Sequence, residues 1–383
     1  MTSRTMMIVA GEASADLHGA RLVHALRRRW PELDCFGIGG PALRRAGTRI
    51  LVEAADLAVV GITEVAAKAP ALLRALVLAR GELARRRPGL LVLIDFPDFN
   101  LLLARSARRL GIPVLYYVSP QVWAWRPGRI RTIARRVDHM AVILPFEAAL
   151  YRRHGVPVTF VGHPLMDGAA PPAAGPRSGP VQVGLLPGSR DREVERHLPV
   201  MIAAVERLRP RYPEAVWRVS VAPTVASSRV DAILAGHGTP GGYETVAGRT
   251  SDLLAASTLV VAASGTVTLE AAIAGTPTIL LYKVSPLSYR LGRRLVRVAH
   301  IGLPNLIAGA PVIPELIQDQ ATPEAVARHM AALLDDPQSR ERMRTALAQV
   351  RRRLGPPGAS ERLAAIAQRM MSASPGPPKA PAP

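Results

Sequence analysis

Two carboxylates stand where a buried strand should give way to a helix. Asp95 directly follows the apolar run Leu90–Ile94, and Asp98 comes three residues later. A carboxylate at the carboxyl end of a parallel strand can take a proton from a substrate hydroxyl, which is typically worth roughly a hundred- to ten-thousand-fold in rate. Asp98 could instead be a helix N-cap that accepts hydrogen bonds from the first free N–H groups. On spacing alone, the two interpretations have equal weight.

A similar strand-to-helix junction occurs near the start of the chain. The apolar run Met6–Ala10 leads into a segment of small and acidic residues that contains Glu12, Ser14 and Asp16. Such a loop can bind an anion, but the acids and the lack of a G-x-G-x-x-G pattern argue against a dinucleotide pyrophosphate. Polar contacts with a neutral sugar fit better. Helix capping by Ser14 or Asp16 is the stronger alternative from the residues alone.

Two junctions in the second half could together bind a nucleoside diphosphate. Their small and polar residues are Gly188, Ser189 and Arg190 in the first junction, and Ser264, Gly265, Thr266 and Glu270 in the second. Helix N-termini favour phosphates, and Arg190 can chelate one through two hydrogen bonds. Glu270 can accept hydrogen bonds from ribose hydroxyls. Capping alone would have to explain both junctions, and it would leave Glu270 without a partner in an apolar segment.

The composition is that of a globular protein with more than one domain. At 383 residues and 49% hydrophobic content, the chain can bury two cores. Cys35 is the only cysteine, which excludes an intramolecular disulfide and fits a reducing compartment. The run Met6–Ala10 is far shorter than the apolar part of an export signal. We therefore expect a cytoplasmic protein.

The formal net charge of +20 needs an explanation. Solvated helix faces are the ordinary one, and attraction to phosphorylated substrates or to an acidic lipid surface is the functional one. One predicted helix face that fits either explanation carries Arg290, Arg293, Arg294 and Arg297. Nucleic acid is disfavoured, because the basic runs lack interleaved aromatic residues and no binding motif is present. The histidines show no metal-ligand spacing, so we predict neither a metal nor a cofactor.

The order of elements predicts an α/β fold with two doubly wound, Rossmann-like domains that face each other across a cleft, followed by a helical C-terminal segment. The strands are predicted at Met6–Ala10, Leu90–Ile94, Pro113–Tyr117, His139–Leu144 and Val158–Val161, and then at Val181–Leu186, Val216–Ala222, Tyr243–Val246, Thr258–Ala262 and Pro277–Leu281. Their nearly unbroken apolar character indicates strands buried on both faces of parallel sheets. We predict domains at 1–166 and 181–335, a linker at 167–180, C-terminal helices at 336–372 and a disordered tail at 373–383.

Three apolar segments need separate interpretation. Leu253–Tyr282 is long enough to span a bilayer, but Glu270 and the Gly and Pro residues divide it into elements of globular length. Val59–Ile62 and Leu72–Leu78 are expected in the core, and they would provide apolar surface if they were exposed.

The chain resembles the lipid-A-disaccharide synthases, which are inverting glycosyltransferases of the two-domain GT-B type, from about Met7 to Gln318. The motifs that carry the resemblance are Val9-Ala10-Gly11-Glu12-Ala13-Ser14, Gly37-Ile38-Gly39-Gly40-Pro41, Val60-Gly61-Ile62-Thr63-Glu64-Val65, Asp95-Phe96-Pro97-Asp98-Phe99-Asn100, Tyr117-Val118-Ser119-Pro120-Gln121-Val122-Trp123-Ala124-Trp125-Arg126, Leu144-Pro145-Phe146-Glu147, Leu186-Pro187-Gly188-Ser189-Arg190, Ser264-Gly265-Thr266 with Glu270, and Leu303-Pro304-Asn305.

The resemblance implies that a UDP-linked 2,3-diacylglucosamine donates its sugar to 2,3-diacylglucosamine 1-phosphate, which gives a β-1,6-linked disaccharide and UDP. It implies that Asp98 is the base for the acceptor hydroxyl. The implied UDP-binding residues are Gly188, Ser189, Arg190, Ser264, Gly265, Thr266, Glu270 and Asn305, and those on the acceptor side are Glu12, Ser14, Asp16 and Gln121. It further implies a peripheral position on the anionic cytoplasmic face of the inner membrane, and a homodimer that exchanges C-terminal segments.

This chain departs from the family pattern at two positions. Ala15 stands where the family usually has glycine, and a positive φ there would cost strain. Ala42 stands where an arginine is usual, which removes one charge from the acceptor side. Two alternatives to the transferase therefore stay open. One is another UDP-sugar enzyme of this architecture, such as an epimerase, and the other is a nucleotide-sugar binder without catalytic activity.

Overall fold

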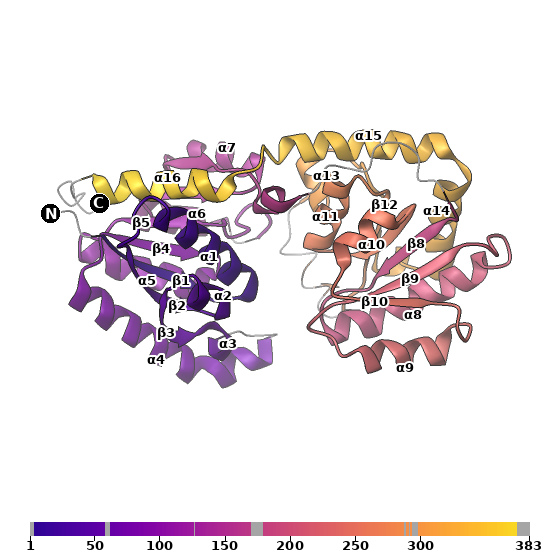
Figure 1. Cartoon of the computed structure of the whole chain (residues 1–383), viewed down its shortest axis with the longest axis horizontal. Helices are drawn as coiled ribbons and strands as arrows, with labels where there is room; N and C mark the ends of the chain where they lie inside the picture. The colour runs from indigo at the N-terminus through magenta and orange to yellow at the C-terminus, as the bar shows by residue number, and fades with distance from the viewer. Residues whose placement is uncertain are drawn as a thin grey trace. The chain divides into compact units, whose positions relative to one another are not determined.

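The computed structural model describes residues 4–57, 62–125, 127–169, 179–286, 289–290, 292 and 298–373, with backbone only at 62–67. These residues belong to two compact units (Figure 1). One unit combines Met1–Asp167 with Leu354–Pro383, and the other is Gly168–Arg353. Most of the predicted linker and tail lies outside the described residues, as do Val59, Val60 and Gly61, and Arg293, Arg294 and Arg297 of the predicted basic helix face.

The first unit is built on a seven-stranded sheet in the order β3-β2-β1-β4-β5-β6-β7, with every pair of neighbours parallel. Its strands are β1 Thr5–Ala10, β2 Asp34–Gly39, β3 Arg49–Glu53, β4 Leu90–Ile94, β5 Val114–Tyr117, β6 His139–Val142 and β7 Val158–Phe160. Its helices are α1 Ala13–Arg27, α2 Pro41–Arg45, α3 Ala54–Leu57, α4 Ile62–Arg86, α5 Pro97–Arg109, α6 Arg129–Arg136, α7 Pro145–Arg153 and α16 Ala359–Ser372, with the 3-10 turn η1 at Pro164–Gly168.

The second unit is built on a six-stranded sheet in the order β10-β9-β8-β11-β12-β13, which is also parallel throughout. Its strands are β8 Gln182–Leu186, β9 Val216–Val221, β10 Glu244–Ala247, β11 Leu259–Ala263, β12 Thr278–Tyr282 and β13 Glu315–Ile317. Its helices are α8 Asp191–Leu208, α9 Ser227–His237, α10 Thr250–Ala256, α11 Thr266–Ala274, α13 Leu303–Ala308, α14 Pro323–Asp335 and α15 Pro337–Arg353, with the 3-10 turn η2 at Gln318–Gln320.

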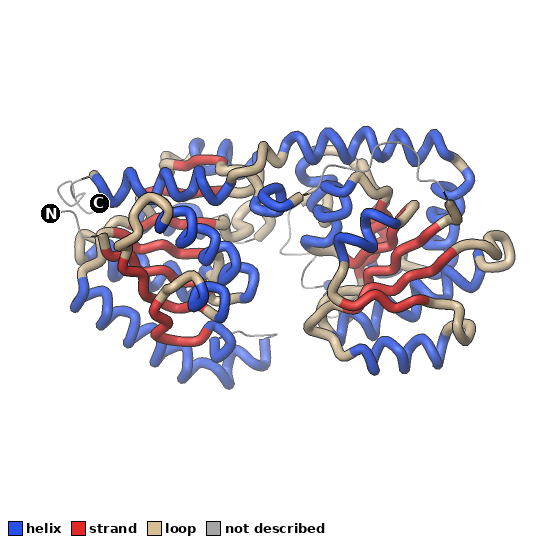
Figure 2. Tube along the Cα trace, in the orientation of Figure 1, coloured by secondary structure: helices blue, strands red, loops and turns tan. Residues whose placement is uncertain are grey.

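Each sheet is covered by helices on both faces (Figure 2), because its strands send alternate side chains to opposite sides. In β1, Met7 and Val9 join a core with α4 and α5, whereas Met6 and Ile8 join a core with α1 and α16. In β8, Leu185 packs beneath α8 and α14, whereas Leu186 packs with α10 and α11. The prediction of two doubly wound, Rossmann-like domains is confirmed.

All ten predicted strands are present with small shifts at their ends, and β2, β3 and β13 are additional. These three escaped prediction for identifiable reasons. Gly37 and Gly39 weaken the apolar signal of β2, β3 begins and ends with the charged residues Arg49 and Glu53, and β13 is only three residues long. The segment Leu253–Tyr282 contains the predicted strand, helix and strand as β11, α11 and β12, and it begins with the end of α10, which was not predicted. Among the described helices, none combines the length and the apolar character needed to cross a membrane.

The sequence predicts one separate C-terminal helical segment at 336–372, whereas its two helices belong to different units. Arg351 and Arg353 of α15 donate to the last carbonyls of α11 and α13, in the second unit. Leu363 and Ile366 of α16 are buried in the core of the first unit. The chain therefore returns to its first unit at Leu354.

The basic runs also have partners within the fold. Arg28 and Arg29 pair with Glu361 of α16, and Arg85 and Arg86 pair with Glu82 one turn earlier in α4. Arg351 and Arg353 bind helix carbonyls, so each of the basic runs 27–29, 85–87 and 351–353 contains arginines that serve the fold.

Asp167 anchors the start of α16. Its Oδ1 accepts hydrogen bonds from the N–H groups of Gly358 (2.8 Å) and Ala359 (2.9 Å), and its Oδ2 accepts from the N–H and hydroxyl of Ser360. Burial opposes ionisation of this carboxyl, but the hydrogen bonds outweigh burial and lower its pKa. Because the folded-state pKa lies below the unfolded one, the stabilisation is present at neutral pH and is lost as the pH falls through the folded pKa.

We predict that Asp167→Asn destabilises α16 by about 1–2 kcal/mol, because the amide NH₂ cannot accept from the helix N–H groups. Amide hydrogen exchange of α16 at pH 7 measures this as loss of protection. Asp319→Asn, in the 3-10 turn η2 of the other unit, is the control. Unchanged exchange of α16 in Asp167→Asn would contradict the anchoring role.

Candidate functional site

The order of strands reverses between β1 and β4 in the first unit, and between β8 and β11 in the second. In doubly wound sheets, ligands bind beyond the carboxyl ends of the strands at such reversals. Gly11 and Asp95 follow the first pair of strands, and Pro187 and Ser264 follow the second pair. Most of the predicted site residues therefore fall into two groups, one at each reversal. Gln121, which follows β5, and Asn305, which lies in α13, are the exceptions.

The turn between β4 and α5 has an unusual backbone. Asp95 (φ 48°) and Phe96 (φ 47°) both adopt the left-handed conformation, which costs a non-glycine residue roughly 1–3 kcal/mol. Two side chains hold this turn by donating to the Asp95 carbonyl, Asn100 through Nδ2 at 2.7 Å and Tyr116 through its hydroxyl at 2.5 Å. The turn is thus fixed from within the unit, and it directs the start of α5.

Gly11 is required beneath this turn. A Cβ at this position would lie 2.6 Å from the ring of Phe96, which is closer than carbon atoms approach. The Phe96 ring in turn stacks on Phe99, with 5.3 Å between centroids. The glycine after β1 therefore lets the β4–α5 turn pack against it.

Asp98 is the second residue of α5, so the N-cap interpretation is wrong, because Phe96 occupies the N-cap position and Pro97 begins the helix. The Asp98 side chain is 78% exposed and forms an ion pair with Arg129, whose side chain is only 14% exposed. The Arg129 guanidinium lies over the Trp125 ring, 5.4 Å from its centroid. Asp98 is accessible to a substrate and is oriented by a partly buried arginine.

The predicted acceptor-side residues differ in environment. Glu12, Ser14 and Gln121 are exposed, whereas Asp16 is 4% exposed. The Asp16 carboxylate accepts from the N–H groups of Gly40 (2.7 Å), Ala42 (2.8 Å) and Leu43 (3.1 Å), and it thereby ties α1 to the start of α2. Asp16 lies inside α1 and does not cap that helix, so the capping alternative is wrong for α1; the carboxylate instead accepts from N–H groups at the start of α2.

The two departures from the family pattern are accommodated. Ala15 lies inside α1 and has no positive φ, so the expected strain does not arise, and alanine is a better helix former than glycine. Ala42 contributes its backbone N–H to Asp16, a contact that any residue except proline can make.

The Asp95 carboxyl is mostly buried beside the turn. Burial, with the negative charge of Glu12 as the second cause, raises its pKa to about 6. Asp95 lies at the reversal with Glu12, since β1 and β4 pair in register at Ala10 and Ile94. Its backbone carbonyl is nevertheless the group that organises the turn.

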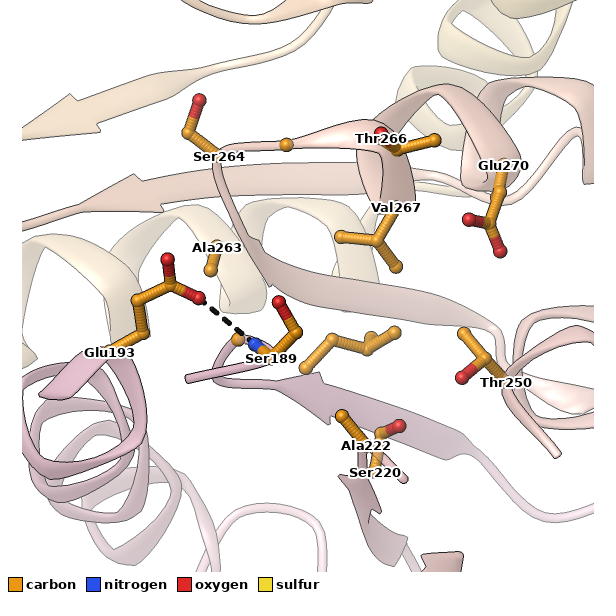
Figure 3. Close-up of a pocket in the computed structure, with 13 residues that line it drawn as sticks. Ser189, Glu193, Ser220, Ala222, Thr250, Ala263, Ser264, Thr266, Val267 and Glu270 are labelled. Atoms are coloured by element: carbon orange, nitrogen blue, oxygen red, sulfur yellow. Dashed lines mark hydrogen bonds between the residues drawn. The ribbon is translucent and has the colours of Figure 1, made fainter. Parts of the chain in front are cut away.

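In the second unit, a cavity of about 250 Å³ opens at the reversal between β8 and β11 (Figure 3). Six of the predicted residues line it, namely Gly188, Ser189, Ser264, Gly265, Thr266 and Glu270. Arg190 and Asn305 do not line it. Sequence spacing therefore identified both walls of the cavity, because each wall begins where a buried strand ends.

The N-terminus of α11 is open to this cavity. Its N-cap, Gly265, has no side chain, and a Cβ built there would meet nothing within 4 Å. No acidic residue lies in the first turn of α11. The free N–H groups and the positive end of the helix dipole thus form a site suited to an anion such as a phosphate.

The N-terminus of α8 differs because acids already occupy it. Asp191 and Glu193 lie in its first turn, and the Glu193 carboxylate accepts from the Ser189 N–H at 2.9 Å (Figure 3) and from Arg190 Nη1 at 3.1 Å. A Cβ on Gly188 would lie 2.5 Å from Glu193 Oε2, so the glycine makes room for the carboxylate. Glu193 takes the place that an anionic ligand of this loop would take.

Glu270 faces the cavity from the second turn of α11 (Figure 3). Burial raises the pKa of its carboxyl. Within the described part of the chain, no side chain or backbone group forms a hydrogen bond or ion pair with it. A carboxyl group that is half-buried and unpaired at a cavity wall is suited to accept hydrogen bonds from ligand hydroxyls.

Asn305 is buried and serves its own loop. Its Nδ2 donates to the Ile313 carbonyl (2.9 Å) and to Glu315 Oε1 (2.8 Å), while its Oδ1 accepts from Val312 and Ile313. Both donors and the amide oxygen are thus engaged within 302–315. The structure does not bring Asn305 to the cavity with the other predicted UDP-binding residues.

His197 is a residue that sequence reasoning missed. It is 1% exposed, and its Nδ1 donates to the Pro187 carbonyl at 2.7 Å while its Nε2 accepts from the Lys283 N–H at 3.0 Å. Burial lowers its pKa, so the ring is neutral at physiological pH. His197 joins the loop after β8 to the end of β12. The sequence signal that could have identified His197 is its position one turn after Glu193, on the inner face of α8.

Within the described ranges, no group of three His, Cys, Asp or Glu side chains lies close enough to hold a metal ion.

We predict that Glu193→Gln binds UDP about three- to ten-fold more tightly, because it removes a negative charge from the wall of the cavity. Isothermal titration calorimetry gives the affinity. Glu195→Gln is the matched control, since Glu195 lies on the same helix but pairs with Arg229 and does not line the cavity. Weaker UDP binding by Glu193→Gln would mean that Glu193 supports the loop more than it competes with the ligand.

Comparison with solved structures finds the same two-domain fold in other proteins. The putative UDP-N-acetylglucosamine 2-epimerase from Listeria monocytogenes superposes with a TM-score of 0.67 at 12% identity, covering 97% of each chain. A calicheamicin glycosyltransferase superposes with a TM-score of 0.62 at 16% identity, covering 97% of this chain and 99% of its own. At such identities the likeness is one of fold alone.

The sequence comparisons are more specific. The family model described as lipid-A-disaccharide synthetase matches residues 6–370. The lipid-A-disaccharide synthase of Geobacter sulfurreducens is 47% identical over 378 residues, which cover 97% of this chain and 98% of the relative. That of Syntrophus aciditrophicus is 47% identical over 382 residues, covering 98% and 100%. The resemblance inferred from the motifs is therefore confirmed, and the chain belongs to the lipid-A-disaccharide synthetase family of glycosyltransferases.

Proposed function

We propose that the chain transfers 2,3-diacylglucosamine from UDP to the 6-hydroxyl of 2,3-diacylglucosamine 1-phosphate, with inversion and release of UDP. The observation that supports this proposal is that two different kinds of chemical group lie at the two strand-order reversals. One reversal presents an exposed carboxylate, Asp98, and the other presents an unoccupied helix N-terminus at a cavity. A transferase needs both a base for the acceptor and a site for the leaving diphosphate.

The donor is assigned to the second unit. The N–H groups at the start of α11, next to Gly265 and Thr266, would bind the diphosphate, and Glu270 would accept from the ribose hydroxyls. Gly188 and Ser189 would lie on the opposite side of the ligand. Arg190, once released from Glu193, can bind a phosphate oxygen and stabilise the charge that develops on UDP as it leaves.

The acceptor is assigned to the first unit. Asp98 would take the proton of the acceptor 6-hydroxyl while that oxygen forms a bond to the anomeric carbon of the donor. The bond between this carbon and the UDP phosphate oxygen breaks on the opposite face, and its electron pair leaves with UDP. Arg129 would keep the Asp98 carboxylate oriented during the transfer, and Glu12, Ser14 and Gln121 would bind acceptor polar groups.

A peripheral position on an anionic membrane belongs to the same proposal, since both substrates are acylated. The expectation that Leu72–Leu78 lies in the core is wrong for part of this range, because Leu73, Val77 and Leu78 of α4 are 62%, 61% and 44% exposed. Ala75 and Leu76 face the core instead. The exposed Arg74 lies among the apolar residues and suits anionic headgroups.

Two further apolar side chains, Leu102 and Trp125, are exposed close to Asp98. Leu102 is 43% exposed one helical turn after Asp98, and Trp125 is 37% exposed beneath Arg129. Acyl chains of the acceptor would find apolar contacts here. We also propose a homodimer that exchanges C-terminal segments. In this dimer, α16 of one copy packs on α1 of the other copy instead of on its own α1.

We predict that Asp98→Asn keeps the UDP affinity of the wild type and lowers kcat at least about a hundred-fold, because the amide cannot take a proton. The measurement is release of UDP from the diacylated donor with and without acceptor. Asp335→Asn removes another exposed aspartate that pairs with an arginine, in the second unit, and should keep full activity.

UDP release that does not depend on the acceptor would instead support the alternative of another UDP-sugar enzyme of this architecture. Binding of UDP without any turnover would support the alternative of a nucleotide-sugar binder. Wild-type activity in Asp98→Asn would remove Asp98 from the mechanism.

For the membrane contact, we predict that Leu73→Ser combined with Val77→Ser reduces sedimentation with phosphatidylglycerol vesicles several-fold, because each exposed side chain contributes about 1.5–3 kcal/mol when buried. Wild-type sedimentation should weaken as salt is raised, since arginines contribute. Leu17→Ser changes an exposed leucine of α1 and is the control. Equal loss in the control would argue against α4 as the contact.

A further inference from the structure

Glu147 is a buried carboxyl group to which neither motif nor spacing assigned a role. It is 1% exposed and is the third residue of α7. Its Oε2 accepts from the N–H of Leu144, the N-cap residue of the same helix, at 3.1 Å. Its Oε1 accepts from the indole Nε1–H of Trp123 at 3.1 Å. The side chain thus joins the start of α7 to the segment that follows β5.

Burying a carboxyl group in this position costs free energy. Its hydrogen bonds explain why a carboxyl group nevertheless suits the position. Burial raises the pKa of Glu147 to about 7, although hydrogen bonds from Leu144 and Trp123 oppose the shift. Among the described lysines, arginines and histidines, none forms an ion pair with it. Hydrogen bonds from Ile143 and Ser119 also oppose the shift, so donors surround both carboxyl oxygens. Glutamine would keep one acceptor oxygen and turn its NH₂ toward the donors at the other position.

The segment held by Glu147 is Ser119–Trp125, hereafter the β5 loop. Three side chains of α7 contact it. Phe146 packs edge-on against the Trp123 ring, with 5.2 Å between centroids, and the Tyr151 hydroxyl lies 2.8 Å from Ser119 Oγ. Glu147 lies between them in sequence and makes the bond to Trp123. The loop therefore rests on α7, from its first turn to Tyr151.

The other end of the β5 loop leads to the proposed base. Trp125 closes the loop and lies beneath the Arg129 guanidinium, and Arg129 pairs with Asp98. Gln121, another exposed side chain of the loop, is on the proposed acceptor side. A shift of Trp123 would move Trp125, which is two residues away, and with it the support of Arg129.

We propose that Glu147 is a positioning residue of the acceptor side, which with Trp123 holds the β5 loop in the conformation that places Arg129 against Asp98. This inference rests on the proposed role of Asp98. Glu147 itself touches no substrate. Its effect on turnover passes through Trp123, Trp125 and Arg129.

The test is a double-mutant cycle between Glu147→Gln and Trp123→Phe. Each variant should lower kcat about ten- to a hundred-fold, because small displacements of a reacting group have effects of this size. The KM for the UDP-linked donor and the UDP affinity should stay at wild-type values, because the donor cavity is in the other unit. The double variant should be no slower than the slower single variant, since both changes break the same hydrogen bond.

Two controls separate positioning from general loss of structure. Trp217→Phe removes a buried indole of the second unit whose Nε1 has no hydrogen-bond partner among the described residues, and it should keep full kcat. In an Asp98→Asn background, Glu147→Gln should cause no further loss, because there is no base left to position. Thermal unfolding of each variant reports whether it folds, and tryptophan emission of Glu147→Gln reports whether the environment of its tryptophans, Trp123 among them, has changed.

Several results would overturn the inference. They are wild-type kcat in Glu147→Gln or Trp123→Phe, multiplicative losses in the double variant, or a raised donor KM that matches the loss of kcat. If Glu147→Gln does not fold, Trp123→Phe decides alone, since it keeps the ring packing on Phe146. A wild-type protein without acceptor-dependent UDP release would refute the proposed function instead, which distinguishes the two failures.

Discussion

Parallel pairing of every strand is the constraint on which the rest of this structure depends. Parallel strands end at a common edge, so the segments after β1 and β4, and those after β8 and β11, must gather there. At each reversal the following helices go to opposite faces, as α1 and α5 do in the first unit. The segments part at this point and leave space for a ligand. The same geometry thus places a carboxylate at the sheet edge of one unit and exposed N–H groups at the sheet edge of the other.

The two helix N-termini at the cavity differ in their local charges. α11 has no acid in its first turn, so its dipole is available to a ligand, whereas Asp191 and Glu193 neutralise the start of α8. Arg190 is held by one of those acids at the loop itself. Under the proposed function, a diphosphate would bind at the start of α11, and at the start of α8 it would have to compete with the Glu193 carboxylate for Ser189 and Arg190.

The sequence predicted most of the fold and one part of the sites well. Apolar runs buried on both faces identified ten strands, and position after such a run placed Asp98 and the cavity residues at the sheet edge. It could not separate Asp16 and Asn305 from ligand-binding residues, because the same polar side chains also satisfy backbone groups of folded loops. Glu147 and His197 escaped because their partners lie 24 and 86 residues away, and only the folded chain brings them together.

The return of α16 to the first unit has a consequence for how the protein is made. Leu363, Ile366 and Met371 complete one core of a unit whose strands are all encoded before residue 161. During synthesis, the ribosome must translate the whole second unit before it supplies this helix. Until then, the apolar surface of α1 and β4 that α16 covers is exposed in the first unit. A chaperone can bind the nascent chain at this surface.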